Sequence, residues 1–385
     1  MSNTGPRRNR FAAAAGLVLT GALLLVGCSQ PAAENDDADA AASGGETSSV
    51  VEAASEKVTE FSSFDQEFPE ITPFTPVPGK ADVIAMGSTA EVVQLNSEYT
   101  VDAFEAAGWE VRGPLDGEFS APVTGGLIDA AVAEGRDAIV GVSVNLQDIG
   151  TSVTNALDAG VTITCVMCPP FPELVDAGVI FVTVDMEKQG EILGWNMIQQ
   201  SEGSGKFMSL EDPGSFNTVR RADGFDRIIE ENCPDCEVME RLTQPSSDIG
   251  LPGPPQWSGW LNGNPAGDTP FYVNSMADVV GVPMTKTVQS IGRTDVFIGG
   301  FDSDEEAVDM IRQRDTPYLG TVALPYHWGD WAAVDLTLRQ KAGEELWDAQ
   351  DLPMQLVNYD NVDDFTEFVP EGDWEGEFKK SWGVS

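Results

Sequence analysis

Short apolar runs alternate with amphipathic segments from residue 80 onward, and this alternation constrains the fold more than any other feature of the chain. Runs such as 82–86 and 138–142 have the length and the β-branched content of buried strands, and the segments between them carry apolar residues at helical spacing. The runs recur about every 25 to 30 residues, which indicates parallel strands joined by covering helices. We therefore expect an α/β fold of two doubly wound, Rossmann-like parallel sheets.

The N-terminus has the pattern of a bacterial lipoprotein signal. Arg7, Arg8 and Arg10 precede an apolar run that ends at Gly27 and Cys28. A single spanning helix is the alternative, but the run is at the short end of the roughly 17–25 residues that a membrane span needs. We expect a signal peptide over 1–27, a lipid on Cys28, and a protein held by that lipid outside the cytoplasm, on the outer face of the cell membrane or in the periplasm.

Charge and length constrain the rest of the chain after Cys28. Residues 28–78 begin with an acidic stretch that has few large apolar groups, which predicts a flexible tether. The net charge of −42 excludes a nucleic-acid partner, because phosphate backbones require a basic surface; either export or adaptation to salt could account for it. The remaining length favours two lobes, and the expected boundaries are 79–185 plus 325–353 for the first lobe and 186–324 plus 354–385 for the second.

Four further cysteines form two C-x-x-C units. In a reducing compartment this spacing would favour a metal or redox site. Outside the cytoplasm, two local disulfides that fix turns are the better interpretation. The expected pairs are Cys165 with Cys168 and Cys233 with Cys236.

Four short motifs in the strand and helix pattern carry a family resemblance. They are Arg221-Ala222-Asp223-Gly224-Phe225, Gly300-Phe301-Asp302, the run 135–139 and the run 156–161. Over residues 80–370 they resemble the type I periplasmic binding proteins of the ribose-binding class. The resemblance implies two lobes joined by a three-stranded hinge, with crossings near Asp185, 321–324 and 352–355.

Candidate ligand contacts come from loops at the ends of predicted strands, because the carboxyl ends of parallel strands face a ligand crevice. Sugars need planar polar side chains for their hydroxyls and aromatic faces for their C–H surfaces. The resemblance points hardest to Phe301 and Asp302, although Asp302 could also cap a helix and Arg221 could pair within its lobe. The expected contacts are Ser88, Thr89, Glu91, Ser143, Asp185, Phe216, Asn217, Arg221, Asn274, Asp278, Phe301, Asp302, His327 and Trp328.

The sequence also departs from the family pattern. Met167-Cys168 stands where an Asp-Arg pair is expected, Val219 occupies the position of a contacting arginine, and the hinge glutamine is missing near Ala323 and Leu324. These departures argue against a simple pentose or hexose and leave a less polar or aromatic-stacked ligand open.

An enzyme is not expected. The chain contains no G-x-S-x-G elbow, and Gly203-Ser204-Gly205-Lys206 lacks the spacing of a phosphate-binding loop. We expect no cofactor and no metal. The predicted function is a monomeric, lipid-anchored solute-binding protein that captures a small polar ligand, a carbohydrate or similar compound, and delivers it to the permease of an ABC importer. The alternative is a sensory module of the same fold that presents its ligand to a membrane receptor.

Overall fold

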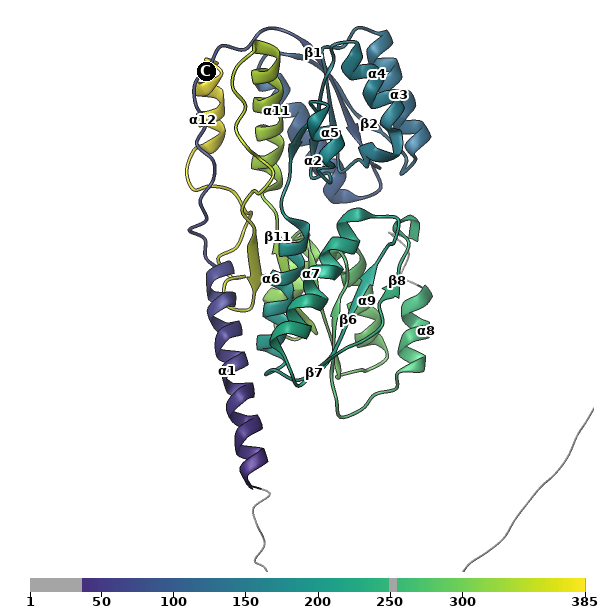
Figure 1. The fold of residues 1–385 in the computed structure, drawn as a ribbon, viewed down its shortest axis with the longest axis vertical. Helices are drawn as coiled ribbons and strands as arrows, with labels where there is room; N and C mark the ends of the chain where they lie inside the picture. The colour runs from purple at the N-terminus through teal and green to yellow at the C-terminus, as the bar shows by residue number, and fades with distance from the viewer. Residues whose placement is uncertain (1–36, 249–254, 385) are drawn as a thin grey trace, which may run out of the picture. The chain divides into compact units, whose positions relative to one another are not determined.

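The computed structural model describes residues 37–248 and 255–384 and contains two lobes, each built on one β-sheet with helices on both faces (Figure 1). This confirms the predicted α/β fold class. The predicted signal peptide and Cys28 lie outside the described residues. Within the described ranges, no helix has the length and apolar character needed to cross a membrane.

The first lobe contains a five-stranded parallel sheet in the order β2-β1-β3-β4-β5. Its central strands are fully buried, which explains why they read as continuous apolar runs in the sequence. Helices α2 and α11 cover one face, and α3 and α4 pack together against the sheet as well. The strands are β1 (Lys80–Ala85), β2 (Glu110–Asp116), β3 (Ala138–Val142), β4 (Thr162–Val166) and β5 (Ile180–Val182). The helices are α2 (Glu91–Ala106), α3 (Ala121–Ala133), η1 (Leu146–Ile149), α4 (Gly150–Asp158), α5 (Pro172–Asp176) and α11 (Tyr326–Ala342).

The second lobe contains a sheet in the order β12-β11-β10-β9-β6-β7, with β8 paired to β6. Only β12 runs antiparallel to its neighbour among the strand pairs of the described residues. Its strands are β6 (Gly205–Glu211), β7 (Cys236–Val238), β8 (Leu242–Thr243), β9 (Phe271–Asn274), β10 (Val296–Phe301), β11 (Tyr318–Ala323) and β12 (Gln355–Asn358). Its helices are α6 (Met186–Gln200), α7 (Phe216–Asn232), η2 (Ser246–Asp248), α8 (Pro255–Gly263), α9 (Asp278–Ser290) and α10 (Glu305–Gln313).

The chain passes between the two sheets at three places: between β5 and α6, between β11 and α11, and between Leu352 and β12. Two of these segments are hydrogen-bonded to each other. The amide of Thr183 donates to the carbonyl of Ala349 at 2.8 Å, and the amide of Leu352 donates to the carbonyl of Thr183 at 3.1 Å. The first and third crossings are therefore joined to each other.

The segment that the sequence predicted as a flexible tether is helical over α1 (Asp37–Phe61). Ala54 and Val58 are buried against the core, and Val50 and Phe61 pack beside them at helical spacing. The side chain of Gln199 on α6 donates to the Ser55 hydroxyl at 3.3 Å. The acidic composition concealed this apolar stripe, because Glu52, Glu56 and Glu60 are exposed on the outer face of the helix.

Residues 62–79 are also held by specific contacts. Asn361 in the second lobe donates to the carbonyl of Ser62 at 3.0 Å, whereas Trp109 in the first lobe donates to the carbonyl of Val77 at 2.9 Å. The ring of Phe68 meets that of Trp328 edge-on at 5.1 Å. This part of the chain therefore contacts both lobes.

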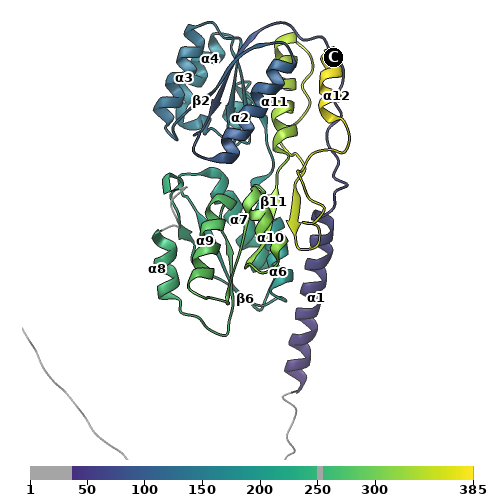
Figure 2. The same cartoon turned by 180° about the vertical axis from the view of Figure 1, so that it is seen from behind.

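The C-terminal helix α12 (Trp374–Ser381) returns to the first lobe, where the sequence placed it in the second. It packs against α11, and Figure 2 shows the two helices side by side. Trp382 stacks on Trp331 at 5.5 Å and donates its indole N–H to the Asp335 carboxylate at 2.9 Å. Only β12 within 354–385 joins the second sheet.

Neighbouring alanines test whether α1 is a packed helix. Ala54→Asp should lower the free energy of unfolding by about 2 kcal/mol, because it buries a carboxylate without a partner. Ala53 is exposed, so Ala53→Asp should leave stability within about 0.5 kcal/mol. Denaturant unfolding monitored by circular dichroism measures both. Equal stability of the two variants would contradict the packing.

Candidate functional site

A cavity of about 420 Å³ lies between the two lobes, at the carboxyl ends of their strands. Loops after β1, β2, β3 and β4 form its first-lobe wall, and loops after β6, β9 and β10 form much of its second-lobe wall. Met186 and Leu324 line it from two of the hinge crossings. Of the predicted contacts, the cavity is lined by Ser143, Phe216, Asn217, Arg221 and Asp302.

Backbone strain is concentrated around this cavity. Nine non-glycine residues in the described chain have positive φ, and five of them line the cavity, each just after a strand. Each such conformation costs of order 1–3 kcal/mol and persists only where surrounding contacts impose it. The five are Phe119 (φ 50°), Ser143 (57°), Met167 (53°), Met276 (64°) and Asp302 (100°).

Hydrogen bonds to neighbouring strands hold these turns. The amide of Ser143 donates to the carbonyl of Val166 at 2.9 Å, and the amide of Met167 donates to that of Val182 at 2.7 Å. The side chain of Asn274 accepts from the amide of Met276 at 2.9 Å. The strained turns thus continue the hydrogen-bonding pattern of the sheets. Their side chains are therefore held in fixed positions.

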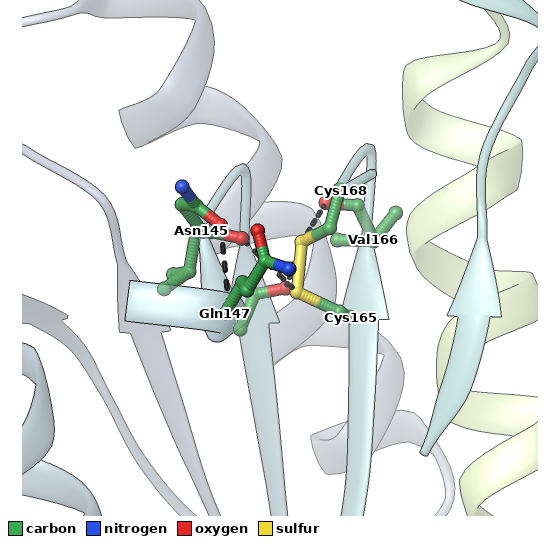
Figure 3. Close-up of a disulfide and its surroundings, with 7 residues drawn as sticks. Asn145, Gln147, Cys165, Val166 and Cys168 are labelled. Atoms are coloured by element: carbon green, nitrogen blue, oxygen red, sulfur yellow. Dashed lines mark hydrogen bonds between the residues drawn. A yellow bond between two sulfur atoms is a disulfide. The ribbon is translucent and has the colours of Figure 1, made fainter. Parts of the chain in front are cut away.

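A disulfide fixes the turn at Met167. Both predicted pairs, Cys165–Cys168 and Cys233–Cys236, are present. Cys165 and Cys168 are buried on either side of Met167, and Figure 3 shows their disulfide beside Asn145 and Gln147 of the turn after β3. This disulfide therefore supports a cavity wall, while Cys233–Cys236 lies between α7 and β7, away from the cavity.

A buried polar cluster forms the second-lobe wall. The Arg221 guanidinium donates to Gln189 Oε1 at 2.6 Å, to the Met276 carbonyl at 2.9 Å and to Asp302 Oδ1 at 2.9 Å. The Tyr326 hydroxyl donates to the same Asp302 oxygen at 2.7 Å. Arg221 and Asp302 are 6% and 9% exposed, so the ion pair is well shielded from water and firmly oriented.

Two glycines place Arg221 in this cluster. A Cβ atom at Gly190 would lie 1.9 Å from the carbonyl oxygen of Arg221, and one at Gly224 would lie 1.9 Å from that of Glu187. Helices α6 and α7 can therefore cross with their backbones in contact, which brings Gln189 within reach of Arg221. The ring of Phe301 lies 4.7 Å from the guanidinium carbon.

Further carboxyls lie behind Asp302. Burial raises the pKa of Asp278 well above its usual value, and the negative charges of Asp304 and Asp302 raise it further. Burial, followed by the charge of Asp302, raises the pKa of Asp304 to about 7. Asp278 accepts hydrogen bonds from the hydroxyls of Tyr318 at 2.6 Å and Thr321 at 2.7 Å. The cluster therefore carries less negative charge at neutral pH than its three carboxyls suggest.

Four predicted contacts in the loops lie outside the cavity lining. Ser88, Thr89 and Glu91 are exposed residues at the start of α2, and Ser88 bonds to the carboxylate of Asp116. Asp185 is also exposed and caps α6 by accepting from the amide of Glu187 at 2.9 Å.

Five other predicted contacts are packed away from the cavity lining. Asn274, Asp278 and Phe301 are buried beneath the cavity lining. Asn274 supports the turn at Met276, and Asp278 accepts from an amide in the loop after β10. The ring of Phe301 packs against the Arg221 guanidinium. His327 stacks on Tyr99 at 3.7 Å, and Trp328 is buried against Phe68. Their chemistry suits a sugar, but neighbouring elements cover them.

The sequence-based choice of sugar contacts left out much of the lining. Met86, Met167, Met186 and Met276 all line the cavity, as do Phe119 and Tyr326. Three of these methionines follow β1, β4 and β9 within two residues, which is the available sequence signal. The Oδ1 atom of Asn217 is buried and has no hydrogen-bond partner among the described residues.

Comparison with known proteins identifies the fold. A family model described as "Periplasmic binding protein domain" matches residues 97–345. No curated protein matches the sequence. Three solved structures that resemble the chain share at most 21% identity with it, so they show the fold alone.

The three structures have similar coverage. An ABC sugar transporter subunit from Rhodobacter sphaeroides has a TM-score of 0.65 and 21% identity, over 74% of this chain and 99% of its own. A solute-binding protein from Agrobacterium vitis with bound allitol has a TM-score of 0.67 and 17% identity, over 74% and 97%. One from Mycobacterium smegmatis with bound glycerol has a TM-score of 0.67 and 19% identity, over 77% and 100%.

The helix crossing that seats Arg221 can be tested with two glycine substitutions. Gly224→Ala should lower the free energy of unfolding by about 2 kcal/mol, since the new methyl group meets a backbone carbonyl. Gly126 in α3 is exposed with open space around its Cβ position, so Gly126→Ala should raise stability by about 0.5–1 kcal/mol. Chemical denaturation compares them; a neutral Gly224→Ala would refute the close crossing.

Proposed function

The chain belongs to the family of periplasmic binding protein domains, and from that premise we propose that it captures a small hydroxylated ligand, a sugar or sugar-like compound, in the cavity between its lobes. The observation that carries this proposal is the cavity itself, which combines strained turns from both lobes with the oriented Arg221–Asp302 pair. Similar structures with bound allitol and glycerol support hydroxylated ligands.

Binding would couple the two lobes. Ligand contacts come from both walls, and the hinge segments line the cavity between them. A ligand that touches both walls favours the arrangement in which they are close together. No covalent step is needed for this function.

We also propose that the protein is lipid-anchored through Cys28 and delivers its ligand to an ABC permease. The signal-like N-terminus supports the anchor, and the family supports the delivery. In its own cells the processed, lipid-bearing protein should be found in the membrane fraction. Cys28→Ser should remove this form and leave either a protein that still carries its signal segment or a protein released into the medium. An unchanged mature mass and an unchanged response to lipid labelling would contradict lipidation.

Binding is tested by thermal unfolding of residues 29–385, exported and purified with the disulfides formed, in the presence of neutral sugars and polyols. A ligand that binds only the native state raises the midpoint of unfolding. Absence of any shift across the panel at millimolar concentration would count against capture of this ligand class.

Two asparagines on α7 locate the site. Asn217→Ala should weaken binding roughly 2- to 12-fold, which corresponds to one lost hydrogen bond, with little change in stability because Oδ1 has no protein partner. Asn232 lies at the other end of α7 and donates to the carbonyl of Ile228 at 3.0 Å, so Asn232→Ala should not alter affinity. Calorimetric titration gives both values. Equal affinities would place the ligand elsewhere.

A further inference from the structure

The geometry points to a more specific ligand: an uncharged molecule that joins a hydroxylated group to an aromatic ring or a similar apolar body. This inference rests on the proposed function, because it assigns a ligand class to the same cavity. Aryl glycosides and nucleosides both have this chemistry, and a titration with matched ligands separates them.

The first-lobe wall of the cavity is mainly apolar. Met86, Val93, Phe119, Val144 and Met167 line it from α2 and from the loops after four strands. A free sugar placed against this wall would lose hydration from hydroxyls that meet few partners there. Thioether groups, in contrast, pack well against aromatic rings.

Two of the polar side chains on the same wall already form hydrogen bonds within the protein. The amide of Asn145 donates to the Asp148 carboxylate at 2.8 Å, and its oxygen accepts from the amide of Gln147 at 3.3 Å. The Ser120 hydroxyl caps α3 at 3.5 Å from the amide of Val123. Asn145 and Ser120 thus stabilise the loops. Apart from the Thr124 and Ser143 hydroxyls and the Asp148 carboxylate, the wall offers a ligand mostly methyl, methylene and thioether surface.

The second-lobe wall carries the polar contacts. Arg221, Asp302 and Tyr326 form one hydrogen-bonded group there, and the free Asn217 oxygen lies on the same helix as Arg221. Hydroxyl groups can both donate and accept, so they can join this network without a change of charge. The ligand therefore needs its hydroxyls on the side that faces α7 and β10.

Charge favours a neutral ligand. Asp148, Asp212 and Asp302 line the cavity, whereas Arg221 is the one basic residue among the described lining residues and is already paired with Asp302. Asp212 accepts from the amides of Gly214 at 2.9 Å and Ser246 at 2.8 Å. An anionic ligand would meet the carboxylates of Asp148 and Asp212, which have no cationic partner among the described residues.

Two phenylalanines supply aromatic surface for the apolar part of the ligand. Phe119 and Phe216 line the cavity while 37% and 40% exposed, which is high for such large apolar side chains. The Phe119 ring lies against Gly87, where a Cβ would be 2.1 Å from it, so the backbone supports the ring from one side. Phe216 meets Phe171 of the first lobe edge-on at 5.5 Å. A ligand ring would cover the surface that these side chains leave open.

Calorimetric titration of the same protein tests the inference with matched ligands. The panel contains free pentoses and hexoses, their methyl and phenyl glycosides, ribonucleosides and sugar phosphates. For the preferred sugar, the phenyl glycoside or the nucleoside should bind at least tenfold more tightly than the free sugar and the methyl glycoside. The stronger of the two identifies the source of the ring, and phosphates should bind more weakly than their parent sugars.

Variants connect this preference to the first-lobe wall. Phe119→Ala should lower affinity for the aryl ligand at least fivefold and leave affinity for the free sugar within twofold. Met86→Gln should act in the same direction and serves as a second test if Phe119→Ala folds poorly. Phe64 is 44% exposed and does not line the cavity, so Phe64→Ala is the matched control and should alter neither affinity.

Each outcome decides between the inference and the proposed function. Equal affinities for the free sugar and its phenyl glycoside would overturn the inference and leave sugar capture intact. Tightest binding by a phosphate would overturn the requirement for a neutral ligand. Failure of every uncharged member of the panel to bind would overturn the proposed function as well.

Discussion

The cavity depends on a constraint of backbone geometry: five of its lining residues have positive φ just after the carboxyl ends of parallel strands. Neighbouring strands impose these conformations by accepting the amides of Ser143 and Met167, and the Cys165–Cys168 disulfide encloses the turn at Met167. Because the rigid sheets carry the strain, the side chains are positioned before a ligand arrives. Such pre-organisation reduces the conformational entropy that binding must remove.

Helix packing does the same for the polar wall. The glycine contacts between α6 and α7 bring Arg221 beside Gln189. The ring of Phe301 packs against the Arg221 guanidinium. Asp302 and Tyr326 then complete a network in which each polar atom has a defined direction. The polar wall is therefore set by packing within the second lobe together with Tyr326, which begins α11 of the first lobe directly after a hinge crossing.

Sequence patterns predicted the features that local physics controls. Buried parallel strands are continuous apolar runs, so the α/β fold class followed from periodicity, and the C-x-x-C spacing together with the export signal predicted both disulfides. Asp302 was found because it follows a predicted strand, and Arg221 because it begins one of the motifs that carry the family resemblance. Composition was misleading for α1: an acidic average hid the stripe that includes Ala54 and Val58.

Tertiary packing decided the remainder of the site. His327 and Trp328 come after a strand as Tyr326 does, yet α2 and residues 62–79 cover them while Tyr326 faces the cavity. No local pattern distinguishes these three neighbours. The methionines were left out because a search for sugar-binding side chains favours amides and carboxylates.

The central claim is that one small molecule binds between the lobes without being altered. A crystal structure of the chain soaked with the tightest ligand of the panel tests it most directly. We predict intact ligand density with hydroxyls near Asn217, Arg221 and Asp302 and the apolar part near Phe119 and Met167. Density outside this cavity, or density for a cleaved product within it, would contradict the claim.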